Sequence, residues 1–350
     1  MLLREADPLH TETLHALPKA ELHVHLDGSL RPSTMLELAA DLQVSLPASE
    51  PQGLAEAMRA ADSRNLEEYL EKFAITLSLM QTPGAMERIA FELAEDAARE
   101  NVRYLEIRYS PVLHTKKGMS LEEAVAAPLR GLSRAEGELG IRTGLILCGI
   151  RSMEPSVSLR LAELAVTFMD QGVVAFDLAG PEAGNPARAH REAFQHAEDH
   201  NLPVTIHAGE AAGADSIAQA VHECHARRIG HGTRLLEDPA LEAFVNDHRI
   251  PLEVCLTSNV QTRVVPSLAE HPFRRYFDAG LVVTLNTDNR LMSGTTLTQE
   301  YALAREHLGL TWDELKEVSL LGFQSAFLPY EAKVNLLEEV EGEMAGLEAE

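Results

Sequence analysis

The segment AELHVHLDG, residues 20–28, contains two histidines separated by one residue. If this segment is a strand, side chains alternate between its two faces, so His23 and His25 project from the same face, and Asp27 continues the alternation. Two adjacent imidazoles are a typical half of a zinc site. The pair alone more often means two polar residues at a strand end. The positions of other candidate ligands therefore decide between the two interpretations.

Two further candidate ligands occur much later in the chain. His207 lies in the motif TIHAGE, and Asp288 lies in LNTDN. Together with His23 and His25 they form a set of three nitrogens and one oxygen, which suits zinc with one position left open for water. Zinc lowers the pKa of a bound water to near neutrality, which generates a hydroxide nucleophile. The set therefore predicts hydrolytic chemistry.

Two more residues suit acid–base work beside such a nucleophile. Glu210, three residues after His207, is placed to face a substrate as a general acid. His231, in the motif RIGHG, is placed to orient or deprotonate the water. Each candidate also has a structural interpretation, with Glu210 on the surface, His231 in the core and Asp288 as a helix N-cap.

The elements that would position these residues alternate along the chain. Short apolar runs, each followed by an amphipathic pattern, predict an α/β fold in which eight strands and their helices form a (β/α)8 TIM barrel. Active sites in such barrels lie at the carboxyl ends of the strands, where all the candidate residues fall. The predicted strands cover residues 21–26, 102–109, 142–150, 173–178, 203–207, 228–231, 251–256 and 281–286.

The helical patterns indicate a single domain, residues 1–350, with two special segments. Residues 33–80 exceed an ordinary connection after the first strand, and we expect them to form a helical insertion that acts as a lid, with helices over 33–41 and 65–80. Residues 338–350 contain six glutamates and are expected to form a frayed or solvated acidic tail. The other predicted helices cover 82–100, 121–139, 155–171, 185–200, 215–226, 239–246, 271–279 and, in several pieces, 296–339, with Asn185 and Pro186 as an N-cap and first-turn pair.

Composition excludes several classes of protein. The 350 residues carry a formal net charge of -24, which argues against nucleic acid and anionic membranes as partners. No stretch approaches the roughly 20 apolar residues of a membrane span, and the charged first residues are not typical of a signal peptide. The three cysteines form no CxxC pair, which fits the reducing cytoplasm.

The motifs ELHVHLDG, DLAGPE, TIHAGE, RIGHG, CLTSN and LNTDN occur in the order and rough spacing of the adenosine deaminase family of metal-dependent amidohydrolase barrels. The resemblance covers residues 17–330. It implies a zinc enzyme, with one Zn²⁺ per chain, that hydrolyses adenosine and 2′-deoxyadenosine to inosine and ammonia in purine salvage. The partner it implies is a small purine nucleoside.

The resemblance also implies roles for individual residues. Zinc would be bound by His23, His25, His207 and Asp288. Glu210 would protonate the purine N1, while His231 and Asp288 would position and activate the water that attacks C6. The backbone at Gly180 would contact the purine N3, and His25 and Asp27 would hold the ribose 5′-hydroxyl.

One position departs from the family pattern. Members often carry two consecutive aspartates where this chain has Asp288 and Asn289. The second residue is expected to donate a hydrogen bond to the purine N7, and an asparagine donates through its NH₂ group without a pKa shift. The change is therefore compatible with the same substrate.

Two rival functions stay open. A relative that deaminates another 6-aminopurine, such as adenine, an N6-substituted nucleotide or aminodeoxyfutalosine, has the same metal chemistry. Asp27 argues against a 5′-phosphate, because two anions would meet in a poorly solvated cavity. A non-catalytic nucleoside-binding protein would not need the ligand set or Glu210. The zinc deaminases that carry a PCxxC motif are a separate class, and this chain lacks that motif.

Overall fold

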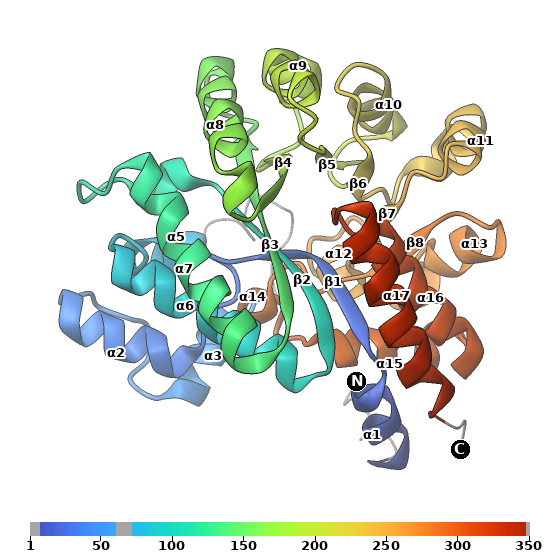
Figure 1. Ribbon diagram of the computed structural model, residues 1–350, viewed down its shortest axis with the longest axis horizontal. Helices are drawn as coiled ribbons and strands as arrows, with labels where there is room; N and C mark the ends of the chain where they lie inside the picture. Colours follow the sequence, from blue (N-terminus) through green and yellow to red (C-terminus); the bar gives the residue numbers. More distant parts are fainter. Residues whose placement is uncertain (1–7, 61–71, 348–350) are drawn as a thin grey trace.

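Eight parallel strands form the centre of the protein in this computed structural model, which describes residues 8–60 and 72–347 (Figure 1). Every predicted strand is confirmed, with bounds that differ by at most two residues. Apolar, β-branched sequences buried on both faces are typical of a parallel sheet covered by helices. The strands are β1 Lys19–His25, β2 Val102–Tyr109, β3 Arg142–Ile150, β4 Val173–Ala179, β5 Thr205–Ala208, β6 Arg228–His231, β7 Leu252–Val254 and β8 Val283–Leu285.

The strands close into a barrel through two short bridges. Strands β1 to β4 form one hydrogen-bonded sheet in sequence order, and β5 to β8 form a second. A parallel bridge between Phe176 and Val204 joins β4 to the start of β5, and another between Val24 and Asp288 joins β1 to the chain beyond β8. The predicted (β/α)8 TIM barrel is therefore confirmed. Since the second bridge contains Asp288, barrel closure also places a candidate site residue.

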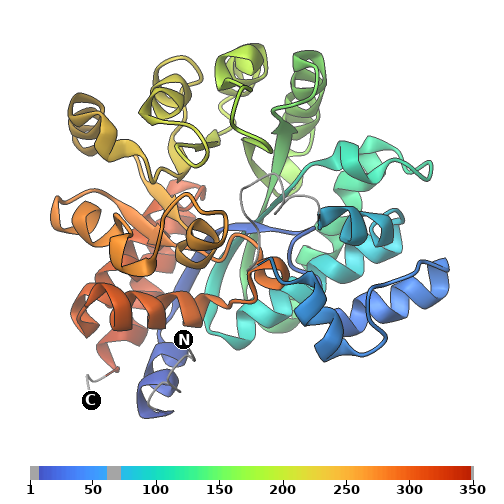
Figure 2. The same cartoon turned by 180° about the vertical axis from the view of Figure 1, so that it is seen from behind.

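The helices that follow the strands lie outside the barrel, as the views from both sides show (Figures 1 and 2). Capping boxes begin the helices α7 Leu121–Leu139, α15 Leu297–Leu308 and α16 Trp312–Ser325. In each box a Ser or Thr side chain and a Glu or Gln three residues later satisfy free backbone N–H groups. The outer helices are α6 Pro83–Arg99, α7 Leu121–Leu139, α8 Pro155–Thr167, α9 Arg191–Asp199, α10 Ala214–His222, α11 Pro239–Asp247, α13 Phe273–Asp278 and α16 Trp312–Ser325.

Further helices lie at the ends of the barrel or, in the case of α17, against α16. Helix α1, Pro8–Ala16, precedes β1 and contacts α15, and the sequence did not predict it. None of the helices in the described part of the chain is long and apolar enough to cross a membrane. The remaining helices are α12 Leu256–Gln261, α14 Arg290–Ser293, α15 Leu297–Leu308 and α17 Tyr330–Ala345.

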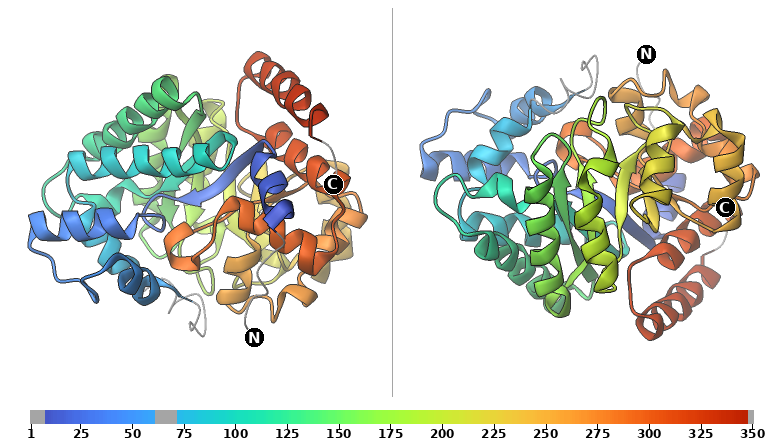
Figure 3. Two further views of the ribbon diagram at one scale, coloured as in Figure 1. Left: turned by 90° about the horizontal axis from the view of Figure 1, so that it is seen from below. Right: turned by 90° about the horizontal axis from the view of Figure 1, so that it is seen from above.

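The segment between β1 and α6 is a helical insertion that projects from one side of the barrel (Figure 3). It contains α2 Pro32–Leu42, α3 Pro51–Met58, which was not predicted, and α5 Phe73–Leu79. The first part of the helix predicted over 65–80 lies outside the described residues. Helix α5 contributes Phe73 and Leu77 to the wall of the central cavity, which is the position that the expected lid would occupy.

Two local predictions are wrong. Asn185 does not cap a helix, because its side-chain amide donates to the carbonyls of Pro181 and Ala183, and α9 begins only at Arg191. Of the two expectations for the acidic segment from residue 338, fraying does not hold for its described residues, whereas exposure of its glutamates to solvent does. The segment continues α17 to Ala345 with Val340 and Met344 buried, while its glutamates in this helix are exposed to solvent.

Candidate active site

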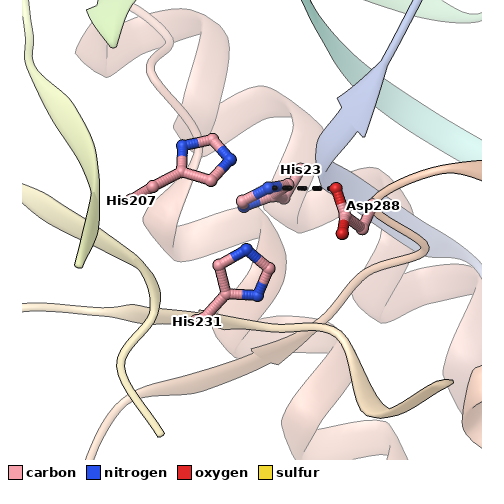
Figure 4. Close-up of side chains that lie close together, drawn as sticks. All are labelled: His23, His207, His231 and Asp288. Atoms are coloured by element: carbon pink, nitrogen blue, oxygen red, sulfur yellow. Dashed lines mark ion pairs between the residues drawn. The ribbon is translucent and has the colours of Figure 1, made fainter. Parts of the chain in front are cut away.

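Four histidines and one aspartate converge at the carboxyl ends of β1, β5, β6 and β8. We call them the His/Asp cluster: His23, His25, His207, His231 and Asp288. Nε2 of His25 lies 3.1 Å from Nε2 of His207. Oδ1 of Asp288 lies 3.6 Å from Nε2 of His23 and 3.5 Å from Nε2 of His25. Figure 4 shows His207, His231 and Asp288 around the ring of His23.

Two members of this cluster adopt an unfavourable backbone conformation. His231 has φ +63° and Asp288 has φ +60°, in the left-handed region that costs a non-glycine residue about 1–2 kcal/mol. Hydrogen bonds to β1 hold Asp288, because its N–H donates to the carbonyl of His23 and its carbonyl accepts from the N–H of His25. Such strain persists only where surrounding contacts impose it, and it is concentrated at functional sites.

Buried carboxylates orient the histidine rings from behind. Nδ1 of His23 lies 2.9 Å from Glu253, and Nδ1 of His207 lies 3.0 Å from Asp177. A carboxylate accepts only, so each Nδ1 carries the hydrogen and each Nε2 presents its lone pair to the cluster. This arrangement is typical of metal-binding histidines.

Arginines inside the barrel balance these carboxylates. Arg108 is fully buried and pairs with Asp177 at 3.1 Å and Glu253 at 2.8 Å, while Arg228 bridges Glu253 and Glu106. Burial alone would raise the pKa of Asp177, but His207 and Arg108 lower it well below its usual range. The carboxylate therefore stays charged behind His207.

The donor set fits a zinc ion. Among the described residues, Nε2 of His23 is buried without a hydrogen-bond partner, which is costly unless something else binds it. The observed separations of 3.1–3.6 Å match the edges of a tetrahedron with zinc–ligand bonds of about 2.0–2.2 Å. One ligand atom from each of His23, His207, His231 and Asp288 also lies within 4.8 Å of the others, so His231 is a second candidate for the third nitrogen ligand.

Glu210 lies beside this cluster, with Oε2 3.6 Å from Nε2 of His231. Its side chain is buried, and burial, followed by the charge of Asp288, raises the pKa of the Glu210 carboxyl well above its usual range. A raised pKa favours the protonated form of the carboxyl, which is the form that can donate a proton.

Glu182 holds the loop that carries Glu210. Its buried carboxylate accepts hydrogen bonds from the backbone N–H groups of Gly209, Glu210 and Ala212 at 2.8, 2.9 and 2.8 Å. It also accepts from the hydroxyl of Ser216. Charged acceptors make strong hydrogen bonds, so the loop is fixed in one conformation.

A cavity of about 210 Å³ opens next to the His/Asp cluster. All predicted site residues except His23 line it, and His23 is covered by its neighbours. Gly180 has φ +94°, and a Cβ there would come within 3.3 Å of Ile150, so this stretch of wall is exposed backbone. The wall combines His25, Asp27, Gly180, His207, Glu210, His231, Asp288 and Asn289 with the apolar Phe73, Leu77, Leu113 and Ile150.

Two polar side chains in this wall lack partners for buried oxygens among the described residues. They are Oδ1 of Asp27 and Oδ1 of Asn289. Burial raises the pKa of Asp27 to about 7, with a further contribution from the charge of Asp288. A Cβ at Gly28 would lie 1.8 Å from Oδ1 of Asn289, so this oxygen faces the backbone of Gly28 and the NH₂ group is left for the cavity.

The sequence analysis missed several residues that support the site. Glu253 and Arg108 were hidden inside apolar strands, and the available signal was a charged residue at an inward-facing position of a buried strand. Glu182 in DLAGPE and Asn259 in CLTSN lay in motifs that the analysis had noted but had given no role.

The barrel and the His/Asp cluster at its carboxyl-terminal rim place the chain in the class of amidohydrolase barrels. Residues 18–343 match the family model described as adenosine deaminase. An adenosine deaminase from Mycobacterium sp. (strain JLS) is 44% identical, with 95% of this chain and 96% of that protein covered. One from Mycobacterium leprae is 41% identical with the same coverage. The chain belongs to the adenosine deaminase family, and it is a hydrolytic deaminase.

Solved structures agree with this assignment. An adenine deaminase from Arthrobacter aurescens has a TM-score of 0.88 at 28% identity, covering 94% of this chain and 100% of the other. The N6-methyl-AMP deaminase of Arabidopsis thaliana has a TM-score of 0.83 at 32% identity, covering 95% of this chain and 98% of the other. An amidohydrolase from Burkholderia ambifaria with bound zinc has a TM-score of 0.89 at 26% identity, covering 99% of this chain and 96% of the other.

Proposed function

We propose that this protein is an adenosine deaminase in which a single zinc, bound by His23, His25, His207 and Asp288, supports hydrolysis of adenosine to inosine and ammonia. The observation that carries the proposal is the convergence of this ligand set and the buried carboxyl of Glu210 on one cavity. The zinc-bound relative from Burkholderia ambifaria supports the choice of metal.

Zinc, when bound, would lower the pKa of a water molecule and so supply the nucleophile for C6 of the purine. His25 is preferred to His231 as the third nitrogen ligand, because Nε2 of His25 lies within 3.5 Å of both His207 and Asp288. His231 is assigned to the water instead. Its Nε2 faces Glu210, and its Nδ1 is occupied by Asn259 at 3.0 Å.

Glu210 supplies the proton that activates the ring. Protonation of N1 makes C6 more electrophilic, and the raised pKa of Glu210 favours the protonated form that can donate to N1. Asp288 receives the proton of the attacking water. Ser258 donates to its Oδ2 at 2.5 Å, which leaves Oδ1 directed at the histidines. Asp288 then passes the proton of the water to the amino group on C6, which leaves as ammonia when its bond to C6 breaks. The hydroxyl proton left on C6 returns to Glu210, so both carboxyl groups are restored and the sum is adenosine plus water to inosine plus ammonia.

The remaining wall residues orient the nucleoside. The NH₂ of Asn289 donates to N7, and the exposed backbone at Gly180 contacts N3. His25 and Asp27 hold the ribose 5′-hydroxyl, for which the unpaired Oδ1 of Asp27 is an available acceptor. These contacts fix the face of the purine that the water attacks, and the same pocket accepts 2′-deoxyadenosine.

Other 6-aminopurines fit this cavity less well. Solved relatives act on adenine and on N6-methyl-AMP. Adenine lacks the 5′-hydroxyl, so it would leave the buried Oδ1 of Asp27 without a partner. A 5′-phosphate would bring a second anion to Asp27. A purely binding role does not require a protonated Glu210. A purine nucleoside partner and a cytoplasmic location remain our expectations for this chain.

Metal content tests the proposal. We expect one equivalent of zinc per chain by elemental analysis of the purified protein. Chelation should abolish ammonia release from adenosine, and added zinc should restore it. Less than a tenth of an equivalent of any transition metal, together with activity that chelators leave unchanged, would refute the proposal.

A further inference from the structure

A line of buried side chains links helix α13 to the His/Asp cluster. His271, just before α13, places Nε2 3.2 Å from Oδ1 of Asn259 in α12. Nδ2 of Asn259 lies 3.0 Å from Nδ1 of His231, at the end of β6. All three side chains are at most 5% exposed. The line is therefore shielded from water, and its hydrogen bonds have to be made within the protein.

A backbone N–H group determines which atoms in this line donate and which accept. The backbone N–H of Phe273 donates to Nδ1 of His271 at 3.1 Å. A backbone N–H only donates, so this Nδ1 carries no hydrogen. Burial lowers the pKa of His271 to about 3, so its ring is neutral and its hydrogen sits on Nε2. His271 therefore donates to the oxygen of Asn259.

The orientation of the Asn259 amide follows from this donor. With its oxygen accepting from His271, its NH₂ group faces His231 and donates to Nδ1. A neutral imidazole carries a single hydrogen, which must then sit on Nε2. We propose that His271 and Asn259 are positioning residues that hold His231 in its Nε2–H tautomer, with the orientation set by the backbone N–H of Phe273.

This tautomer defines what His231 does in the reaction, if the proposed function holds. Nε2 of His231 points toward Glu210 and the cluster, so it offers a hydrogen rather than a lone pair. It does not bind the metal through Nε2, and it does not remove a proton there. It donates to the oxygen of the attacking water, and the proton of that water goes to Asp288. Of the two roles expected from the sequence, orienting the water is the one supported.

The tautomer is measured directly by ¹⁵N–¹H correlation of the histidine rings, with the His231 signals identified by their loss in His231→Gln. In wild type, both without and with zinc, we expect the hydrogen on Nε2. Asn259→Asp replaces the donor by a carboxylate that only accepts, so the hydrogen should move to Nδ1. We then expect kcat to fall about 10²-fold or more with KM changed little, since a wrong tautomer impairs the chemical step.

Substitutions at His271 test the far end of the line. His271→Gln keeps a donor for Asn259 and should retain the Nε2–H tautomer and most of kcat. His271→Leu removes that donor and should give a mixture of tautomers and a larger loss. His114→Leu is the matched control. It removes another buried imidazole, which contacts Met80 and Tyr109, and should not alter the His231 signals.

Two results would overturn the inference. One is a wild-type His231 with its hydrogen on Nδ1. The other is an Nε2–H tautomer that persists in both Asn259→Asp and His271→Leu. If Asn259→Asp does not fold, the two His271 variants decide. Failure of the proposed function is separate, because the tautomer is read without substrate. Nε2–H signals in a protein that releases no ammonia would leave the hydrogen-bond line intact and reject the deaminase.

Discussion

The surroundings of Glu210 suit the role of general acid that we propose for it. The residue is surrounded by Asp288, Glu182 and His231, and its backbone is held by Glu182. Both negative neighbours favour the protonated form of the carboxyl. The side chain is thus ready to give a proton to a base that enters the cavity, while the loop does not need to move.

Substitution of this acid separates its role from that of the metal ligands. We expect Glu210→Gln to keep one zinc and to lose about 10²-fold or more in kcat, the usual scale for general acid catalysis. Elemental analysis and steady-state kinetics on the same preparation provide the measurement. Glu122→Gln on the exposed surface of α7 is a control for loss of a carboxylate. Loss of zinc, or near-full kcat, in Glu210→Gln would assign the residue another role.

The NH₂ group of Asn289 is expected to donate a hydrogen bond to N7 of the purine. A 7-deaza analogue replaces this acceptor by C–H and leaves the amide without a partner, which costs about 1–3 kcal/mol. That corresponds to about 5- to 150-fold in kcat/KM between adenosine and the analogue. Asn289→Leu should lose most of this discrimination. Equal treatment of the two substrates by wild type, or unchanged discrimination in the leucine variant, would show that another group contacts N7.

The sequence indicated which residues meet at the site better than it indicated their hydrogen bonds. His23, His207 and Asp288 could be placed from strand ends alone. The partners of His231 could not, because Asn259 lies 28 residues away and the direction of its amide depends on His271, a further 12 residues on. Such networks are fixed by tertiary packing, which local patterns do not encode.

At the scale of elements, a single glycine in α7 allows helices α6 and α7 to pack closely. A Cβ at Gly131 in α7 would lie 2.2 Å from the carbonyl oxygen of Glu87 in α6. The same helix contains Gly137, where a Cβ would meet nothing within 4 Å. The two positions differ in packing rather than in backbone conformation.

This contrast makes a matched pair of variants. Gly131→Ala should lower the free energy of unfolding by about 1–3 kcal/mol, because overpacking forces the helices apart. Gly137→Ala should raise it by up to about 1 kcal/mol, since alanine favours the helix. Urea unfolding of both proteins is the measurement. A destabilising effect at Gly137, or none at Gly131, would contradict the packing described for this helix pair.

Strands were predicted more accurately than helix ends. Each apolar run was long enough to identify a buried strand, as in β2 and β3, whose bounds match the prediction. Helix ends depend on which backbone groups a capping residue meets. Asn185 satisfies two carbonyls of its own loop instead, and helix α3 is too short for its apolar positions to stand out.

At the scale of the whole molecule, closure of the barrel creates the site. The chain beyond β8 returns to β1, and this contact brings Asp288 to His23 and His25 across most of the sequence. Charged residues inside the barrel then hold the histidine rings. The insertion after β1 adds apolar side chains from α5 to the cavity, so the cavity wall combines the barrel with a segment outside it.

The central claim is that this architecture deaminates a 6-aminopurine nucleoside. The most direct test is ammonia release by the purified, zinc-loaded protein from adenosine, adenine, AMP and N6-methyl-AMP at equal concentrations. We expect kcat/KM for adenosine to exceed that for the other three, with inosine as the product, because Asp27 accepts a 5′-hydroxyl and opposes a 5′-phosphate. Faster reaction with adenine or with either nucleotide, or no ammonia from adenosine, would contradict this account.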